Sequence, residues 1–357
     1  MIANIQAEGQ SAAVRRWLWL VWALVFAMVV LGGVTRLTGS GLSITEWQPL
    51  IGALPPLHQS DWLTLFAKYQ QSPQYRVVNA QMTLEGFKNI FFWEYLHRLV
   101  GRSIGAAVLL PWLYFVWRKR LPRALARNVL GVFALGGLQG LLGWYMVRSG
   151  LVDEPRVSHY RLAAHLFLAF LTGQLVLWLA LDVATPRERG KRVAFVHAAM
   201  IGALLCALAL QVVYGAFMAG THAGYYYSSF PDMNGHYSPA PFFHGASWLR
   251  DAASDPSAIH YLHRAIAFAL LFFALFVAVY LWLVEPRRAV ARAALLVAAL
   301  VFVQLDLGAL TVLRRVALPL AVAHQAMAYL LASSATLLLH RALGSERRSR
   351  APARSAQ

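Results

Sequence analysis

The sequence predicts an all-α membrane protein with eight transmembrane helices, arranged as two pseudo-symmetric four-helix bundles. Of the 357 residues, 59% are hydrophobic and only 13% are charged, and the mean hydropathy is +0.52. This composition excludes a water-soluble protein. The apolar residues gather into runs of about 20 residues, the helical length that crosses a hydrocarbon core of roughly 30 Å. Short strings that recur in both halves of the chain predict the duplicated arrangement.

Eight apolar runs are long enough to be membrane spans. The fifth run contains Cys206, the single cysteine of the chain, so an intramolecular disulfide or a cysteine-rich metal site is excluded. Any metal chemistry therefore falls to the twelve histidines. The predicted spans cover residues 17–35, 91–117, 127–147, 162–181, 193–218, 261–284, 291–313 and 319–340.

The distribution of basic residues predicts that both termini lie in the cytoplasm. An even number of spans places the termini on one side, and the loops on that side hold nineteen Lys and Arg residues, against ten on the other. This excess in short loops follows the positive-inside rule. The formal net charge of +17 therefore sets the topology and does not indicate nucleic-acid binding. Arg15 and Arg16 precede the first span without a typical cleavage site, so we expect a retained signal anchor.

The two longest loops, residues 36–90 and 219–260, face the outside in this topology. Both are rich in Gly, Pro, Tyr and Trp and carry little charge. We expect them to form structured caps on the helix ends, and not separate domains.

Recurring strings predict that the two bundles arose by duplication. EYLHR at 94–98 recurs as HYLHR at 260–264, and LG at 142–143 recurs at 307–308. The predicted halves are residues 1–190 and 191–357, each with four spans. The alternative is chance similarity between apolar segments, because LG and LH pairs are common in such a composition.

Four histidines lie at one predicted depth in the membrane: His97, His165, His263 and His324. Counted from the cytoplasmic end of each span, all four stand roughly 26–33 Å from the inner surface. Two parallel helices in each half thus present imidazoles at equal height, which suits the two axial positions of a haem iron. Each histidine alone is also compatible with a hydrogen-bonded imidazole in the core.

Other metals fit this pattern less well. Zinc requires three or four ligands at closer spacing, and no HxxxH or HExxH string lies within a span. Copper stays open as an alternative, although the space between paired helices better suits a macrocycle.

Charged residues beside these histidines are candidates for further roles. Glu94 precedes His97 by three residues and so shares its helical face, where a carboxyl group could exchange protons with a substrate. The alternative is an acid favoured by the helix dipole or paired with Arg98. Arg98 and Arg264 each follow a histidine and could bind haem propionates, or could extend to the membrane interface.

The other histidines are given no functional role. His197 and His340, near the cytoplasmic ends of their spans, are interpreted as interfacial residues. The rest are assigned to outer loops or helix starts: His58, His159, His222, His236, His244 and His260.

Long stretches of the sequence resemble the haem A synthase family, the CtaA and Cox15 proteins. The resemblance covers nearly the whole chain, and its segments occur in the family's order. They are GGVTRLTGSGLSITEWQPLIGALPP at 32–56, WLTLFAKYQQSPQY at 62–75, MTLEGFKNIFFWEYLHRLVGR at 82–102, QGLLGWYMVRSGL at 139–151 and AHQAMAYLL at 323–331.

The resemblance implies oxidation of the C8 methyl group of haem O to a formyl group, by two successive hydroxylations, to supply haem A to terminal oxidases. His263 and His324 match the axial ligands of a resident haem b, and His97 and His165 match the pair at the substrate haem. Glu94 matches the acidic residue thought essential for the oxidation. The family also implies a bacterial inner-membrane location and a handover of haem O from the farnesyltransferase that makes it.

This chain departs from the family pattern in two places. It lacks the cysteine pair that some members carry in the first outer loop, so it resembles the subgroup without that pair, and thiol-based electron entry is excluded. The tyrosine-rich segment 221–235 also differs from the expected pattern.

Two other functions share parts of this sequence pattern. A transmembrane di-haem b electron-transfer cytochrome would use the same ligands, but needs no difference between the halves. A transporter with repeated halves is the third possibility, but its histidines would be expected near the middle of the membrane.

Overall fold

The computed structural model describes residues 2–46, 51–152, 155–184, 193–238 and 247–344. Within these residues the structure is helical, and the only β-type pairing is an isolated bridge between Met233 and His236. Among the described residues, eight helices are long and apolar enough to cross a membrane, which confirms the predicted all-α membrane protein with eight spans. They are α1 (Ile2–Leu37), α4 (Leu84–Trp117), α5 (Arg123–Arg148), α6 (His159–Ala184), α7 (Phe195–Gly220), α9 (Pro256–Val284), α10 (Arg288–Leu313) and α11 (Leu318–Leu343).

Helices α4 and α9 begin several residues earlier than the hydropathy of the sequence predicts. Helix α4 begins at Leu84 instead of residue 91, after Thr83, whose hydroxyl accepts a hydrogen bond from the Gly86 amide. Helix α9 begins at Pro256 instead of residue 261, after Asp255, whose carboxylate accepts from the Ala258 amide at 2.8 Å. The caps set the helix starts, whereas hydropathy detects only the apolar part of each helix.

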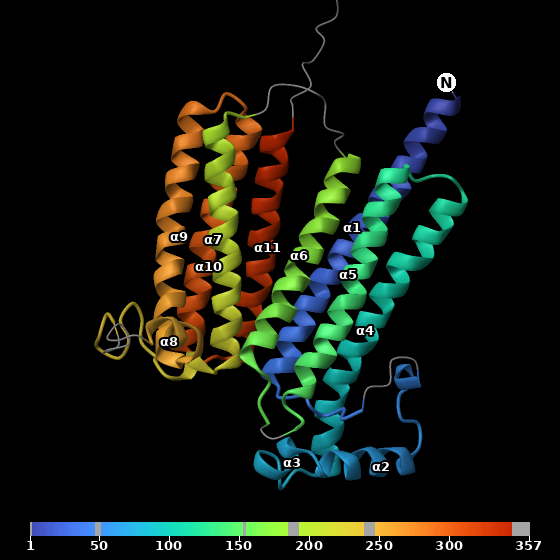
Figure 1. Ribbon diagram of the computed structural model, residues 1–357, viewed down its shortest axis with the longest axis vertical. Coiled ribbons are helices and arrows are strands. Elements are labelled where there is room, and N and C mark those ends of the chain that lie inside the picture. Colours follow the sequence, from blue (N-terminus) through green and yellow to red (C-terminus); the bar gives the residue numbers. More distant parts are fainter. Residues whose placement is uncertain (1, 47–50, 153–154, 185–192, 239–246, 345–357) are drawn as a thin grey trace, which may run out of the picture.

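The long helices pack as two groups of four, which stand side by side in Figure 1. In the first group, α1 and α5 each pack against both α4 and α6, so α4 and α6 lie diagonally across the group. In the second group, α7 and α10 each pack against both α9 and α11. Each group has its own cluster of buried apolar side chains. The predicted boundary at residues 190 and 191, and the basic loop 187–192, lie outside the described residues.

An aromatic cluster joins the two groups where α6 and α11 meet α1. Tyr329 is fully buried, and its ring centre lies 5.9 Å from that of Trp22, 5.6 Å from Phe26 and 5.3 Å from Phe170. A Cβ atom at Gly173 would collide with the Tyr329 hydroxyl group. Glycine at this position therefore allows α6 and α11 to approach closely.

The outward faces of the long helices expose large apolar side chains. Leu110, Phe272 and Leu283 are 63%, 67% and 76% exposed. Contact with lipid accounts for this exposure, because contiguous apolar surface of this extent is rare on a water-soluble protein. The chain is a multi-pass membrane protein.

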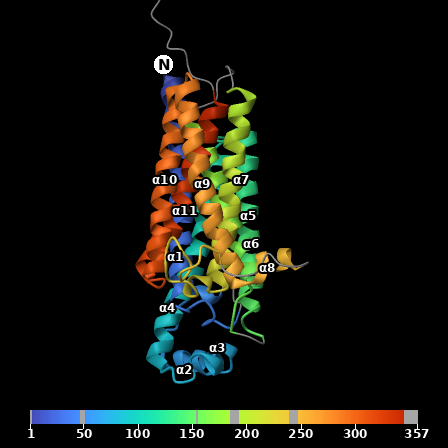
Figure 2. The same cartoon turned by 90° about the vertical axis from the view of Figure 1, so that its left-hand side faces the viewer.

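Short helices cover the end of the molecule opposite the N-terminus, as both views show (Figures 1 and 2). In the first outer loop, Tyr69 is fully buried against Phe87 and Phe91, and Gln74 donates a hydrogen bond to the Gly39 carbonyl at 2.8 Å. Burial raises the pKa of the Tyr69 hydroxyl. The described parts of the two longest loops, residues 36–90 and 219–260, thus form structured caps, as predicted. The short helices are η1 (Ile51–Ala53), α2 (Gln59–Gln70), α3 (Pro73–Val77), η2 (Ala223–Tyr225) and α8 (Trp248–Ser254).

Candidate functional site

Each of the four candidate histidines lies against a glycine on a neighbouring helix of its own group. We call these glycines the seat glycines, because a side chain there would occupy the space of the imidazole ring. A Cβ atom added to a seat glycine would lie within 2.9–3.4 Å of Cε1 of the facing histidine. The pairs are His97 on α4 with Gly32 on α1, His165 on α6 with Gly143 on α5, His263 on α9 with Gly215 on α7, and His324 on α11 with Gly308 on α10.

The four seat glycines stand at the same height in the molecule. Each lies five residues before the last residue of its helix, and all four helices run towards the same end of the molecule, the one opposite the N-terminus. The imidazoles therefore form one layer near that end, as the depth counted from the sequence predicts. The glycines and helix ends are Gly32 and Leu37, Gly143 and Arg148, Gly215 and Gly220, and Gly308 and Leu313.

Three of the imidazoles also lie beside a glutamine. The side-chain Nε2 of Gln139 lies 3.4 Å from Nε2 of His165 and donates a hydrogen bond to the His165 carbonyl at 3.0 Å. Gln211 makes the same two contacts with His263, at 3.5 and 3.0 Å. Gln304 Nε2 lies 3.4 Å from Nε2 of His324. Each glutamine precedes the seat glycine of that histidine by four residues, and so stands one helical turn away on the same face.

The histidine pair of the second group has the spacing that a shared iron requires. The ring centres of His263 and His324 are 6.5 Å apart, and the rings are inclined at 80°. Since an imidazole–metal bond is about 2 Å long, two imidazoles on opposite sides of one iron have ring centres roughly 6 to 7 Å apart. The pair therefore fits two axial ligands of one haem.

Unpartnered polar atoms also fit a site that a cofactor completes. Among the described residues, Nδ1 of all four histidines is buried without a hydrogen-bond partner, and so is Oε1 of all three glutamines. Buried polar groups without partners are rare in folded proteins, and they concentrate where a ligand, an ion or water belongs. The residues of both groups thus suit a large ligand held by imidazoles.

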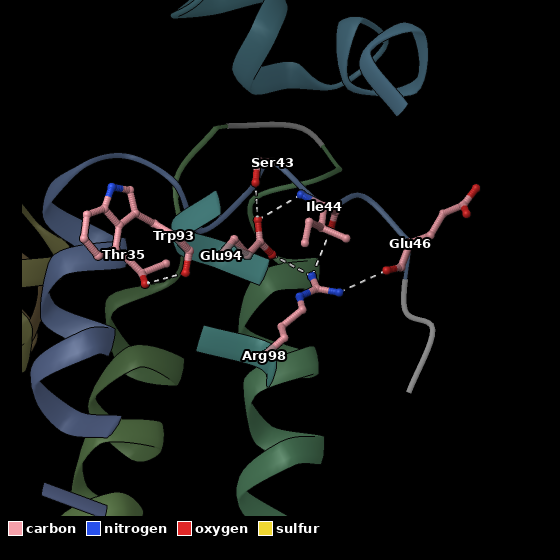
Figure 3. Close-up of polar contacts among 7 residues, drawn as sticks. All are labelled: Thr35, Ser43, Ile44, Glu46, Trp93, Glu94 and Arg98. Carbon is pink, nitrogen blue, oxygen red and sulfur yellow. Dashed lines mark hydrogen bonds and ion pairs between the residues drawn. The ribbon is translucent and has the colours of Figure 1, made fainter. Parts of the chain in front are cut away.

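Glu94 is buried at the outer end of the first group and binds the loop that follows α1 (Figure 3). Its Oε2 accepts hydrogen bonds from the Ser43 hydroxyl at 2.7 Å and from the Ile44 amide at 2.8 Å. Its Oε1 pairs with Nη2 of Arg98 at 2.6 Å. The ion pair between Glu94 and Arg98, considered as an alternative at the sequence level, is therefore present. It does not exclude a role of Glu94 in proton transfer, because a paired carboxylate can still accept a proton from a substrate beside it.

The two arginines that follow histidines hold the outer loops in matching ways. Arg98 donates hydrogen bonds to the carbonyls of Ile44 at 2.9 Å and Glu46 at 3.1 Å. Arg264 is buried and donates to the carbonyls of Asp232 at 2.6 Å and Ser229 at 3.0 Å. Both guanidinium groups thus point towards an outer loop, one in each half of the molecule.

Among the described residues, a carboxyl group one helical turn before a candidate histidine is present in only one of the two groups. Three residues before His263, at the position that corresponds to Glu94, stands His260. His260 is fully buried, and its Nδ1 lies 3.0 Å from the Ala223 carbonyl. The two groups therefore match in their histidines and seat glycines but differ in the group that could take up a proton.

His197 and His340, interpreted from the sequence as interfacial residues, lie near the ends of their helices, and both side chains are buried and paired. His197 Nδ1 lies 3.0 Å from Oε2 of Glu285, and Arg287 binds the other carboxylate oxygen at 2.9 Å. His340 Nε2 lies 3.0 Å from Oδ1 of Asp182 on α6, so it joins the two helix groups. The acidic partners are distant in the sequence, which is why a count along one span could not identify them.

The glutamines and all four seat glycines were missed at the sequence level as parts of the site. A signal was present, because QxxxG occurs in the third, fifth and seventh spans, at 139–143, 211–215 and 304–308. Only its LG portion was noted as a repeat, at 142–143 and 307–308. The facing histidine lies on another helix in each case, so the contact is invisible to any search within one span.

The fold and the site together define a polytopic helical membrane protein in which two groups of four helices each hold a pair of histidines in one layer. The chain belongs to the cytochrome oxidase assembly protein family COX15-CtaA, whose pattern it matches over residues 15–336.

Curated relatives in several bacteria are similar over nearly their whole length. A protein named Heme A synthase from Nitrosospira multiformis is 47% identical over 348 residues, which cover 94% of this chain and 96% of the relative. Proteins of the same name from Nitrosomonas eutropha and Caulobacter vibrioides are 45% and 43% identical. They cover 89% and 92% of this chain, and 90% and 95% of their own lengths.

Proposed function

We propose that this chain is a haem A synthase, which oxidises the C8 methyl group of haem O to a formyl group by two successive hydroxylations. The observation that carries the proposal is the difference between two otherwise matched helix groups. Both present a pair of histidines on seat glycines, but only the first has a buried carboxyl group, Glu94, one turn from a histidine. The names of the relatives support the same activity.

The proposal assigns a different haem to each half. In residues 191–357, His263 and His324 would hold a resident haem b, and their 6.5 Å ring separation supports this assignment. In residues 1–190, His97 and His165 would hold the substrate, haem O. When bound, haem b supplies an iron centre that passes single electrons.

Glu94 would act as the catalytic proton acceptor. Its Oε1 is paired with Arg98, while Oε2 is hydrogen-bonded to the Ser43 hydroxyl and the Ile44 amide. These bonds fix the carboxyl group close to His97, where it could take up the protons that are released when an external electron acceptor oxidises the methyl group and water supplies the oxygen. The ion pair with Arg98 also holds the carboxyl group in one orientation.

Arg98 and Arg264 would bind propionates at the substrate and resident haem respectively. Each guanidinium group lies at the outer end of its helix group and already binds loop carbonyls. Each would then connect a propionate to an outer loop through charge-assisted hydrogen bonds.

The proposal places the protein in the bacterial inner membrane with both termini in the cytoplasm. The excess of basic residues on that side supports this orientation. Haem O is hydrophobic, so a direct handover from the farnesyltransferase that makes it is the expected route of supply.

The test is co-expression of the chain with a source of haem O, followed by extraction and mass analysis of the haems. We expect the formyl product from the unaltered chain. Glu94→Ala should leave haem bound but lower formyl formation by roughly 10²–10⁴-fold, the usual contribution of a general acid or base, or stall it at the hydroxymethyl stage. The matched control is Glu85→Ala, an exposed glutamate on the same helix, which should change nothing.

Each other outcome points to a different function. Full formyl production by Glu94→Ala would refute the catalytic assignment. Two unchanged haems and no formyl product from the unaltered chain would favour the electron-transfer cytochrome. A chain that binds no haem would refute both functions.

A further inference from the structure

The three groups that bind the Glu94 carboxylate also belong to the wall of a cavity. The cavity has a volume of about 420 Å³ and lies between α4 and the first outer loop. Among the described residues, its wall includes Ser43, Ile44 and Arg98, which are the partners of Glu94, but not Glu94 itself. Glu94 is only 3% exposed, so these three partners, drawn in Figure 3, stand between the carboxylate and the cavity.

The cavity connects this buried position with the surface of the molecule. Ser43 is buried, whereas Glu46, Thr64 and Lys68 in the same wall are exposed. A space of this size holds roughly a dozen or more water molecules. Polar and charged side chains in the wall provide hydrogen-bond partners for such water. They are Glu46, Asp61, Thr64, Lys68, Arg98 and Arg102.

Of the three partners of Glu94, one has the chemistry to carry a proton from the carboxyl group to that water. The guanidinium group of Arg98 and the backbone amide of Ile44 are donors without an acceptor lone pair. The Ser43 hydroxyl is both a donor and an acceptor. Its oxygen lies 2.7 Å from Oε2 of Glu94, within the range for direct proton transfer between two oxygens.

We propose that the Ser43 hydroxyl relays protons from Glu94 to water in the cavity. The inference rests on the proposed function, in which Glu94 takes up the protons released from the methyl group. After each uptake, Oγ of Ser43 accepts the proton from Oε2 of Glu94, and the original hydroxyl proton of Ser43 passes to a water molecule. Ser43 is therefore neutral before and after the transfer, and Glu94 is ionised again.

The stoichiometry of the proposed reaction explains why such a relay is needed. Each hydroxylation with water as the oxygen source releases two protons to a base and two electrons to the external acceptor. Glu94 takes up one proton at a time, so the carboxyl group must be deprotonated repeatedly during one conversion. The bonds from Arg98 and Ile44 hold the carboxyl group in place while the proton leaves through Ser43.

Substitutions of Ser43 test the relay by removing the hydroxyl at constant shape. Ser43→Thr keeps a hydroxyl, and Ser43→Val has the same branched shape without one. In membranes that contain the full chain and are supplied with haem O, the initial rate of formyl formation is measured by mass. We expect Ser43→Val to be roughly tenfold or more slower than Ser43→Thr. The matched control is Thr45→Val, which removes a hydroxyl from the same wall that does not bind Glu94 and should behave as the unaltered chain.

A solvent isotope effect separates a relay from a role in holding Glu94. Ser43→Ala leaves space for a mobile water molecule in place of the hydroxyl, so proton transfer continues but becomes slow. The ratio of the rates in H₂O and D₂O should then rise to roughly twice that of the unaltered chain. Loss of a merely structural contact would lower the rate without changing this ratio.

Radiolytic labelling by hydroxyl radicals tests for water in the cavity without reference to catalysis. Radicals formed from water oxidise the side chains that the water touches, and peptide mass analysis locates the products. Phe91 and Tyr95 belong to the cavity wall, whereas Phe87, on the same helix, is fully buried and is not part of the wall. In the full chain, we expect Phe91 and Tyr95 to be labelled roughly tenfold faster than Phe87.

Several results would overturn the relay. Labelling of Phe91 and Tyr95 no faster than that of Phe87 would show that water does not fill the cavity. Equal rates in Ser43→Val and Ser43→Thr would show that the hydroxyl is not needed. If Ser43→Val fails to retain haem, Ser43→Ala decides the question, and an unchanged isotope ratio refutes the relay. Any of these results with normal formyl formation by the unaltered chain would refute the relay alone, whereas absence of the formyl product from that chain would refute the proposed function and the relay with it.

Discussion

Substitution of the seat glycines by alanine gives a graded prediction, because the four seats differ in how closely the imidazole approaches. A Cβ atom at Gly308 would lie 2.9 Å from Cε1 of His324, whereas a Cβ atom at Gly215 would lie 3.4 Å from Cε1 of His263. The second distance is an ordinary contact and the first is not. Gly308→Ala therefore requires the ring to shift by about 0.5 Å, while Gly215→Ala requires almost no shift.

The expected magnitude follows from this difference. Overpacking of a closely packed site costs about 1–3 kcal/mol, which corresponds to a loss of haem affinity of roughly 5-fold to 150-fold at Gly308→Ala. Gly215→Ala should change haem affinity less than threefold. Gly202→Ala, on the same helix as Gly215, is the control, because no atom lies within 4 Å of its Cβ position. Alanine there should stabilise the helix by about 0.5–1 kcal/mol.

The assay is titration of the purified variants with haem, followed by absorbance in the Soret region, with thermal unfolding of the haem-free chain as the check on folding. The ferric haem of Gly308→Ala should also show an altered electron paramagnetic resonance spectrum, because the ligand plane has turned. Equal haem affinity and identical spectra in Gly308→Ala and Gly215→Ala would refute the reasoning that the glycine fixes the ring.

Two further predictions concern buried groups away from the histidine layer. Tyr329→Phe should leave the thermal unfolding temperature unchanged or raise it slightly, because the buried Tyr329 hydroxyl lacks a partner among the described residues. Gly173→Ala should lower the unfolding temperature, because the added methyl group collides with Tyr329. A lower unfolding temperature for Tyr329→Phe than for Gly173→Ala would contradict the packing of α6 on α11. Burial raises the pKa of Glu285, but hydrogen bonds from Arg287 and His197 outweigh this effect and hold the pKa below its ordinary value. The contacts of Glu285 with Arg287 and His197 should therefore stabilise the protein at neutral pH, and this contribution should be lost as the pH falls through the lowered pKa. Glu285→Gln should flatten this acid limb in unfolding measurements from pH 7 to pH 3, while Glu85→Gln should not, and an unchanged limb in Glu285→Gln would exclude the pair as its source.

The sequence was sufficient for the features that depend on composition and on distance along one helix. Hydropathy identified all eight spans, because the hydrocarbon thickness sets their length. Counting from the span ends placed the four histidines at one height, and the seat glycines lie in one layer accordingly. These predictions need only the helical rise of about 1.5 Å per residue.

Features that depend on contacts between distant segments were not predictable in the same way. The early start of α4 comes from the Thr83 cap and from packing of Phe87 against Tyr69, neither of which adds hydropathy. Ser43 was not identified as a partner of Glu94, because the loop after α1 folds back over α4 only in three dimensions. Glutamine in an apolar span carries no specific signal until the facing histidine is known.

The central claim, that each half grips one haem between two imidazoles and that the two haems differ, is tested most directly by identifying the haems that remain in ligand variants. Haems extracted from purified His324→Ala and His165→Ala are separated and identified by mass after co-expression with a haem O source. We expect His324→Ala to lose haem b and retain haem O, and His165→Ala to retain haem b and lose haem O together with its products. Loss of the same haem from both variants, or retention of both haems in either, would contradict the assignment.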